Sequence, residues 1–105
     1  MNRTTNLLCA AATVALCAAA PARADDVAEF YKNHSFTIQI GFGPGGGYDT
    51  TTRIVARHLG KHIPGNPTIL VQNVPGAGSM KVANFIFNAA PKDGTMVGLL
   101  SQSIA

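Results

Sequence analysis

Two glycine-rich segments hold the residues whose types and spacing suit anion binding. The first is residues 41–49 (GFGPGGGYD) and the second is residues 74–79 (VPGAGS). Each lies between a strand-like run and a helix-like run, so each should lead into a helix start whose N–H groups are unpaired. Such a start binds carboxylate or phosphate oxygens at about 2.7–2.9 Å, and glycine leaves the approach open. Two such turns predict one anionic ligand held from two sides.

The hydrophobic pattern predicts the elements that position these two segments. Strands are expected at residues 35–40, 68–72 and 95–100, and helices at residues 49–62 and 79–89. Short connections with right-handed crossovers place the three strands parallel in one sheet, a βαβαβ arrangement of the α/β class. Both glycine segments and the tail 101–103 then reach the carboxyl edge of the sheet, where open α/β sheets bind ligands. With the strand order 2-1-3, the ligand crevice falls between the first and third strands.

The same pattern predicts which side chains face the core. They are spaced for one helical face, namely Ile54, Val55 and Leu59 in the first helix and Val82, Ala83 and Ile86 in the second. The nearly continuous apolar strand 68–72 is expected to be covered on both faces. Asp49 is expected to cap the first helix, with its carboxylate accepting the N–H of Thr51 or Thr52. The polar lead 25–33 is expected to form at most one helical turn.

Residues 1–24 have the pattern of an export signal. Arg3 supplies a positive start, residues 7–20 are apolar and rich in alanine, and residues 22–24 (ARA) fit the A-x-A cleavage pattern. A membrane-spanning helix is the alternative interpretation. However, this apolar run has 14 residues, and a bilayer requires roughly 20. Cleavage is therefore predicted between Ala24 and Asp25, and the product is expected to be exported.

Removal of this signal changes the composition of the chain. Cys9 and Cys17 leave with it, so residues 25–105 would form neither a disulfide nor a thiolate metal site. Loss of Arg3 and Arg23 leaves six basic side chains against five acidic ones, and the net charge falls from +3 to +1. No basic patch interleaved with aromatic residues is present, so nucleic-acid binding is not supported. Residues 25–105 are long enough for one small domain at most.

The first glycine segment also satisfies the dinucleotide pattern G-x-G-x-x-G, through Gly41, Gly43 and Gly46. That pattern requires an early helix start, and an acid at the end of the second strand to bind the ribose. Here Pro44 and the following glycines oppose an early helix, and the second strand ends in Gln72 and Asn73. No Gly-Lys-Ser/Thr follows, which excludes a P-loop. An exported α/β enzyme or a nucleotide-binding protein that uses this loop remains the alternative.

Metal binding and catalysis receive little support from the sequence. His58 and His62 are four residues apart and would share one helical face, but no carboxylate or cysteine lies nearby as a third ligand. No nucleophile elbow, Ser/His/Asp arrangement or close carboxylate pair is present. The sequence therefore predicts a binding protein without a cofactor or metal, and not an enzyme.

Three segments resemble the signatures of the Bug-type extracytoplasmic solute receptors, the substrate-binding proteins of tripartite tricarboxylate transporters. They are residues 42–53 (FGPGGGYDTTTR), 73–78 (NVPGAG) and 91–95 (PKDGT). The resemblance implies a two-lobed periplasmic binding protein that captures a small organic carboxylate and delivers it to a membrane transporter. Members of that family are much longer, so residues 25–105 are expected to be a partial N-terminal α/β lobe. A truncated remnant without function is a further alternative.

The resemblance also implies which residues contact the ligand. Carried over by position, the contacts are Pro44, Gly45, Gly46 and Asp49 in the first loop, Pro75, Gly76, Ala77 and Gly78 in the second loop, and Ser101 after the third strand. Tyr48 stands where the family commonly has a smaller hydroxyl residue, so it is expected to narrow the site or to stack on the ligand. Without a second lobe to exclude water, we expect residues 25–105 alone to bind weakly.

Overall fold

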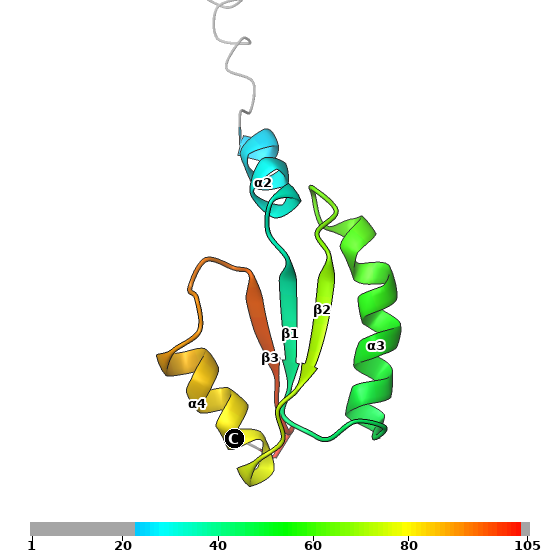
Figure 1. Ribbon diagram of the computed structural model, residues 1–105, viewed down its shortest axis with the longest axis vertical. Coiled ribbons are helices and arrows are strands. Elements are labelled where there is room, and N and C mark those ends of the chain that lie inside the picture. Colours follow the sequence, from blue (N-terminus) through cyan, green and yellow to red (C-terminus); the bar gives the residue numbers. More distant parts are fainter. Residues whose placement is uncertain (1–22, 104–105) are drawn as a thin grey trace, which may run out of the picture.

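The centre of the protein is a three-stranded parallel sheet in the strand order β2-β1-β3 (Figure 1). The structure is a computed structural model that describes residues 23–103, so the predicted export signal lies almost wholly outside the described residues. The elements in chain order are α2 (Arg23–Lys32), β1 (Phe36–Ile40), α3 (Gly47–Leu59), η1 (Gly60–His62), β2 (Ile69–Asn73), η2 (Ala77–Ser79), α4 (Met80–Asn88) and β3 (Met96–Leu99). The predicted α/β class, the βαβαβ order and the parallel sheet are confirmed.

Alternation along the strands gives the sheet two different faces. Ile38 in the central strand is paired in register with Val71 of β2 and Val97 of β3. These three side chains point to the same face because paired residues of parallel strands do so. The neighbouring residue Gln39 pairs with Gln72 and points to the opposite face. Its amide Nε2 donates to Gln72 Oε1 over 3.3 Å.

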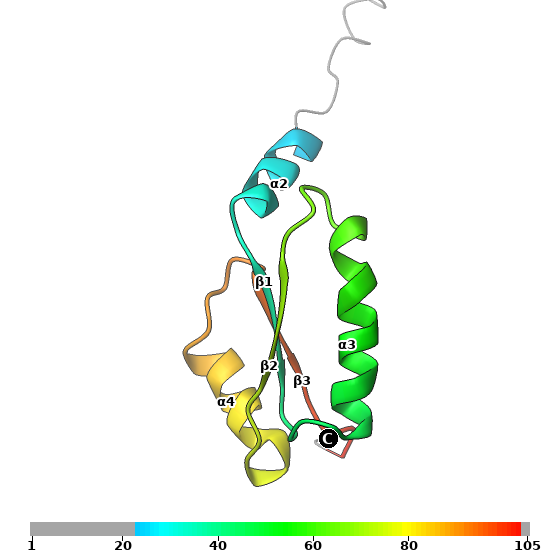
Figure 2. The ribbon, with the colours of Figure 1, turned by 45° about the vertical axis from the view of Figure 1, so that its right-hand side comes forward.

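The two long helices pack on opposite faces of this sheet (Figures 1 and 2). Each helix lies along one edge strand and covers only that part of its face. Helix α3 packs along β2, whereas α4 packs along β3. Gly98 allows the close packing of α4, because a Cβ there would lie 2.9 Å from Val82 Cγ1 and 3.0 Å from Ile86 Cγ1. On the face that carries α3, the surface of β3 is therefore uncovered. On the face that carries α4, the surface of β2 is uncovered.

This half-coverage corrects two predictions about the core. Strand β2 is not covered on both faces, since Leu70 is 43% exposed. In α3, Leu59 is partly buried as predicted, but Ile54 and Val55 are 53% and 50% exposed, and the buried residues are Asp49 and Thr52. A helical periodicity shows that one face is apolar but does not show how much of it a neighbour covers. The expected core residues of α4 are confirmed, because Val82 is fully buried and Ala83 and Ile86 are partly buried.

Helix α2 is a ten-residue helix, longer than the single turn predicted for the polar lead. It lies at the amino ends of the strands, far from the glycine loops (Figure 1). The Tyr31 hydroxyl donates to the Gly94 carbonyl over 2.9 Å and joins α2 to the turn before β3. Gly65 approaches the backbone of Ala28 so closely that a Cβ would clash with it. Of the helices in residues 23–103, none has the length and apolar character needed to span a bilayer.

Candidate functional site

Both glycine loops and the tail after β3 meet at the carboxyl end of the sheet. The Gly41 N–H donates to the Leu99 carbonyl over 3.0 Å, and the Val74 N–H donates to the Ile40 carbonyl over 2.8 Å. A Cβ on Gly41 would lie 2.2 Å from the Cβ of the fully buried Ser79, so the two loops touch there. The structure thus brings the three segments that hold the predicted site residues to one edge of the sheet.

The tail after β3 is attached to the second loop through Ser79. The Ser79 Oγ accepts the Ser101 N–H over 2.8 Å. Ser101 is partly buried, and Gln102 next to it is exposed. The predicted contact residue Ser101 therefore lies directly beside the second glycine loop.

Helix α3 begins earlier than predicted, which changes the role of Asp49. The helix starts at Gly47 with Gly46 as its N-cap, and no side chain caps it. Asp49 is therefore the third helical residue, and its Oδ2 reaches back to accept the Gly45 N–H over 2.9 Å. The predicted cap onto the Thr51 or Thr52 N–H is wrong, because the consecutive glycines permit the helix to start two residues before Asp49. In a capping box, the side chain of the third helical residue likewise accepts a backbone N–H at the helix start.

The Asp49 carboxylate joins the first loop to the end of β2. Its Oδ1 accepts the Asn73 amide over 2.9 Å and the Arg53 Nε over 2.9 Å. The same Asn73 amide donates to the Phe42 carbonyl over 3.1 Å, and Asn73 Oδ1 accepts Arg53 Nη2 over 2.8 Å. The Asp49 side chain is only 7% exposed. This network holds together three segments of the chain, namely the first loop, α3 and the end of β2.

The pKa of Asp49 is lowered from its ordinary value of 3.8 by this network. The hydrogen bond from the Gly45 N–H contributes most, followed by the bond from Asn73, and Arg53 adds a bond and a positive charge. Desolvation acts in the opposite direction but is smaller than these effects together. Asp49 therefore stays ionised at neutral pH, and its oxygens are engaged by donors of the chain. This makes Asp49 a positioning residue for the first loop.

The free N–H donors of the first loop include one predicted contact, Gly46, and two residues that follow it. Pro44 has no N–H, and the Gly45 N–H is used by Asp49. The N–H groups of the N-cap Gly46 and of Gly47 and Tyr48, the first two residues of α3, have no acceptor within the helix. Positions 46 and 47 are exposed, and a Cβ at either would meet no atom within 4 Å. An anion could therefore approach this helix start directly.

The second loop has an unusual backbone. Four consecutive residues have positive φ: Gly76 at 153°, Ala77 at 47°, Gly78 at 59° and Ser79 at 73°. Left-handed conformations cost about 1–2 kcal/mol for residues with a Cβ, so Ala77 and Ser79 are strained. Ser79 is the N-cap of α4 but forms no capping bond, since its hydroxyl is directed to Ser101. Pro75 and Ala77 are exposed at this edge, whereas Gly76 is partly buried.

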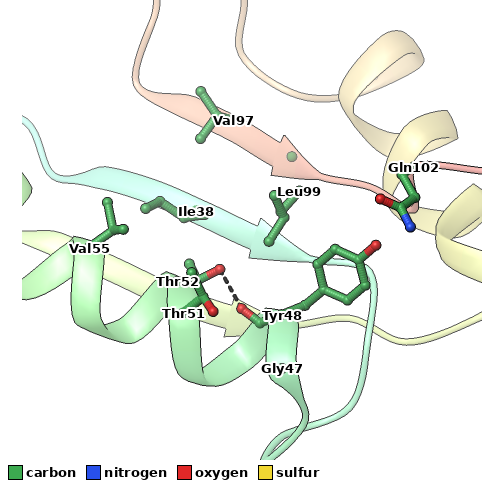
Figure 3. A pocket seen from close by; sticks show the side chains of 10 residues that line it. Ile38, Gly47, Tyr48, Thr51, Thr52, Val55, Val97, Leu99 and Gln102 are labelled. Carbon is green, nitrogen blue, oxygen red and sulfur yellow. Dashed lines mark hydrogen bonds between the residues drawn. The ribbon is translucent and has the colours of Figure 1, made fainter.

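An open groove of about 790 Å³ lies next to the first loop, between α3 and β3 (Figure 3). It occupies the part of the sheet face that α3 leaves uncovered. Its lining residues are Ile38, Gly47, Tyr48, Thr51, Thr52, Val55, Val97, Gly98, Leu99 and Gln102. None of the nine predicted contact residues is among them. The groove lies over β1 and β3, the strands between which the crevice was predicted, but it runs along the sheet face rather than at the carboxyl edge.

A local signal in the sequence could have identified this groove. Tyr48, Thr51, Thr52 and Val55 have the i, i+3, i+4, i+7 spacing of one helical face. Strand alternation places Val97 and Leu99 on the same face as Ile38 and Ile40, because these residues pair in register. Of these residues, Tyr48 alone was expected to affect the site.

Tyr48 marks the end of the groove nearest the loops. Its ring stacks on Phe42, with ring centroids 4.3 Å apart and an angle of 5° between the ring planes. In Figure 3 its hydroxyl and the Gln102 amide lie at this same end, near the tips of the strand arrows. The groove therefore has apolar walls along its length and polar groups at the loop end.

Within residues 23–103 no group of three or more His, Cys, Asp or Glu side chains is placed to hold a metal ion. The ionised groups in the Asp49 network, Asp49 and Arg53, pair with each other. Backbone N–H groups at the start of α3, the Tyr48 hydroxyl and the Gln102 amide are donors that an anion could use. No protein-family model matches the chain, and neither does any curated protein or solved structure with which it was compared.

Proposed function

We propose that this chain is part of a periplasmic receptor that captures a small organic carboxylate and delivers it to a membrane transporter of the tripartite tricarboxylate type. The observation that carries the proposal is the meeting of two glycine loops at one sheet edge, each at the start of a helix. Helix starts attract anions through unpaired N–H groups and the helix dipole. A single carboxylate ligand can use both loops.

The chemistry suits a carboxylate. The first loop offers the N–H groups of Gly46 and Gly47, and the second offers those of Ala77 and Gly78. Charge-assisted hydrogen bonds contribute about 1.5–3 kcal/mol each, so two to four could supply much of the roughly 8 kcal/mol of a micromolar complex. Binding also costs order and freedom, and the exposed edge keeps these contacts in water. We expect the described part of the chain to bind weakly.

The resemblance of residues 42–53, 73–78 and 91–95 to the Bug-type receptors supplies the transporter and the periplasm in this proposal. The first two of these segments form the glycine loops. The third forms the turn before β3, where Asp93 Oδ1 accepts the Thr95 N–H over 3.0 Å and the Thr95 hydroxyl over 2.6 Å. This third turn lies at the opposite end of the strands, so we assign it a structural role.

A dinucleotide site fits the same edge less well. That site needs an acid at the end of the second strand to bind the ribose. The residue there is Asn73, and both ends of its amide are engaged with Asp49, Phe42 and Arg53. An exported enzyme or nucleotide-binding protein therefore remains the weaker proposal.

Thermal denaturation of the chain with a panel of small carboxylates and nucleotides tests the receptor proposal. The informative variant is Gly46→Val, because its Cβ would meet no protein atom within 4 Å and its side chain would stand in the path of an anion. The matched control is Gly43→Val, since position 43 is in the same loop and is equally free of neighbours. A carboxylate at ten times its Kd should stabilise the chain by about 1.4 kcal/mol.

The two variants separate the outcomes. Stabilisation by a carboxylate that is lost in Gly46→Val and kept in Gly43→Val supports the receptor. Stabilisation by nucleotides alone would favour the nucleotide-binding alternative. If a carboxylate stabilises both variants equally, the first loop does not take part in binding.

A further inference from the structure

The groove between α3 and β3 has the dimensions of a small-molecule site. Its volume is about 790 Å³, and ligand pockets commonly measure about 300–1,000 Å³. It lies beside β1 and β3, the neighbouring strands at which the order of the sheet reverses. In open α/β sheets ligands bind outside the carboxyl ends of the strands at such a point, and the end of the groove that Tyr48 and Gln102 line reaches that edge. The groove is thus both large enough and suitably placed.

The walls of the groove are largely apolar, with Thr51 and Thr52 as the polar residues on the α3 side. Ile38 forms part of the sheet surface, while Val55 on α3 and Val97 on β3 stand on opposite sides (Figure 3). Val55 is 50% exposed and Val97 is 42% exposed. Covering such surface gains about 25 cal/mol for each Å² removed from water. An apolar group placed between these walls would therefore be favoured.

The loop end of the groove has a different character. Tyr48 and Gln102 bring a hydroxyl and an amide to that end (Figure 3). The stacked Phe42 ring supports one face of Tyr48. Gly47, the first residue of α3, also lines the groove and connects it to the first loop. One molecule could place an apolar body in the groove and a polar head at this end.

We propose that the groove binds the apolar body of a carboxylate that carries a six-membered ring or a group of similar size. The carboxylate then lies at the Tyr48 and Gln102 end, next to the N–H groups that begin α3. The identity of the head group rests on the proposed function, whereas the apolar body rests on the groove. Such a ligand should bind more tightly than a small acid such as acetate, because it also buries apolar surface between Val55 and Val97.

Titration of the isotope-labelled chain with three probes, followed by nuclear magnetic resonance, tests this inference. Benzoate has a ring and a carboxylate, acetate has the carboxylate alone, and benzyl alcohol has the ring with a neutral head. Benzoate should bind about tenfold more tightly than acetate. It should shift the methyl signals of Val55 and Val97. Benzyl alcohol should bind more weakly than benzoate, since it has no charge for the helix start.

Matched variants locate the ring. Val55→Gln and Val97→Gln should each weaken benzoate about fivefold and leave acetate unchanged. Ile54→Gln is the control on α3, because Ile54 is 53% exposed and does not line the groove. Leu70→Gln is the control on the other edge strand, at 43% exposure and outside the groove. Neither control should change benzoate binding.

The outcomes distinguish the groove from the receptor proposal. Equal affinities for acetate and benzoate, unaffected by Val55→Gln and Val97→Gln, would overturn the groove and leave the receptor standing. Equal affinities for benzoate and benzyl alcohol, both unaffected by Gly46→Val, would support the groove and overturn the carboxylate receptor. Self-association that Val97→Gln abolishes, with no response to benzoate, would show that a second copy covers the groove and would overturn the inference.

Discussion

The two glycine loops reach the same edge of the sheet but are held there by different means. The first loop is fixed by side chains, because Asp49 binds the Gly45 N–H and is itself bound by Asn73 and Arg53. The second loop is fixed by its backbone, through a run of positive φ over residues 76–79. Its only side-chain hydrogen bond among the described residues is the one that Ser79 Oγ accepts from the Ser101 N–H of the tail. The first loop contains an ionised group and the second contains none.

This difference predicts different mechanical behaviour. A loop braced by a charged hydrogen-bond network is organised before a ligand arrives, which lowers the cost of binding. A loop with two strained residues stores energy, and such strain is typical of sites that move or clamp. We therefore expect the first loop to act as the fixed half of the site and the second to open at a lower free energy.

The largest expected effect comes from the place where the two loops touch. In Gly41→Ala the new Cβ would lie 2.2 Å from Ser79 Cβ and 2.8 Å from Ser79 Cα. Both loops cannot keep their positions, because a backbone atom cannot move aside as a flexible side chain can. We expect a loss of about 3 kcal/mol in the free energy of unfolding, measured by urea denaturation. Gly43→Ala, with no atom within 4 Å, should cost far less; equal losses would contradict the contact.

Removal of the charge from the first loop should have the next largest effect. Asp49→Asn replaces an oxygen by an amide that cannot accept from Gly45, Asn73 and Arg53 together. The loss of charge-assisted bonds should lower the midpoint of thermal unfolding by on the order of 10 °C, measured by circular dichroism. Asp93→Asn is the control, since Asp93 lies in the turn at the other end of the strands and leaves both loops intact. A larger loss in Asp93→Asn would mean that the network does not hold the fold.

Acid should release the first loop before it affects the second. Because the pKa of Asp49 is lowered below 3.8 in the folded state, its stabilising contribution is present above this value. It is lost as the pH falls through the folded pKa. The Gly45 amide signal should therefore shift in this range, whereas the Gly78 amide signal should stay constant until the whole chain unfolds. In Asp49→Asn the shift at Gly45 should disappear; if it persists, another group is responsible.

Comparison of the loops also shows what the sequence could predict. The glycines, the apolar runs and the crossover rule are local or general, and they predicted the parallel sheet and the place where both loops end. The Asp49 network joins residues that are 20 to 31 positions apart, such as Asn73 with Arg53 and with Phe42. No local pattern encodes such pairings. The left-handed Ala77 and Ser79 were equally hidden, because glycine is the residue that signals positive φ.

Burial was predicted well in one helix and poorly in the other. Val82, Ala83 and Ile86 pack where periodicity placed them, because α4 lies directly on β3. Ile54 and Val55 have a similar pattern but remain half-exposed, because α3 covers only β2. Periodicity indicates an apolar face, and the tertiary arrangement decides whether that face is covered. The groove proposed as a ligand site is one result of this partial coverage.

The smallest expected effect measures the strain in the second loop. Ala77→Gly removes a Cβ from a residue with φ of 47°, which relieves about 1–2 kcal/mol. The added freedom of glycine in the unfolded chain costs about 0.4–1 kcal/mol, so we expect a net gain of about 0.5 kcal/mol in the free energy of unfolding. In Ser79→Gly the same relief at φ of 73° is offset by loss of the hydrogen bond to Ser101. Urea denaturation compares the two variants. If Ala77→Gly is stabilised and Ser79→Gly is not, backbone strain and the Ser79 contact contribute separately to the stability of the loop. Destabilisation of both would show that the second loop is not strained.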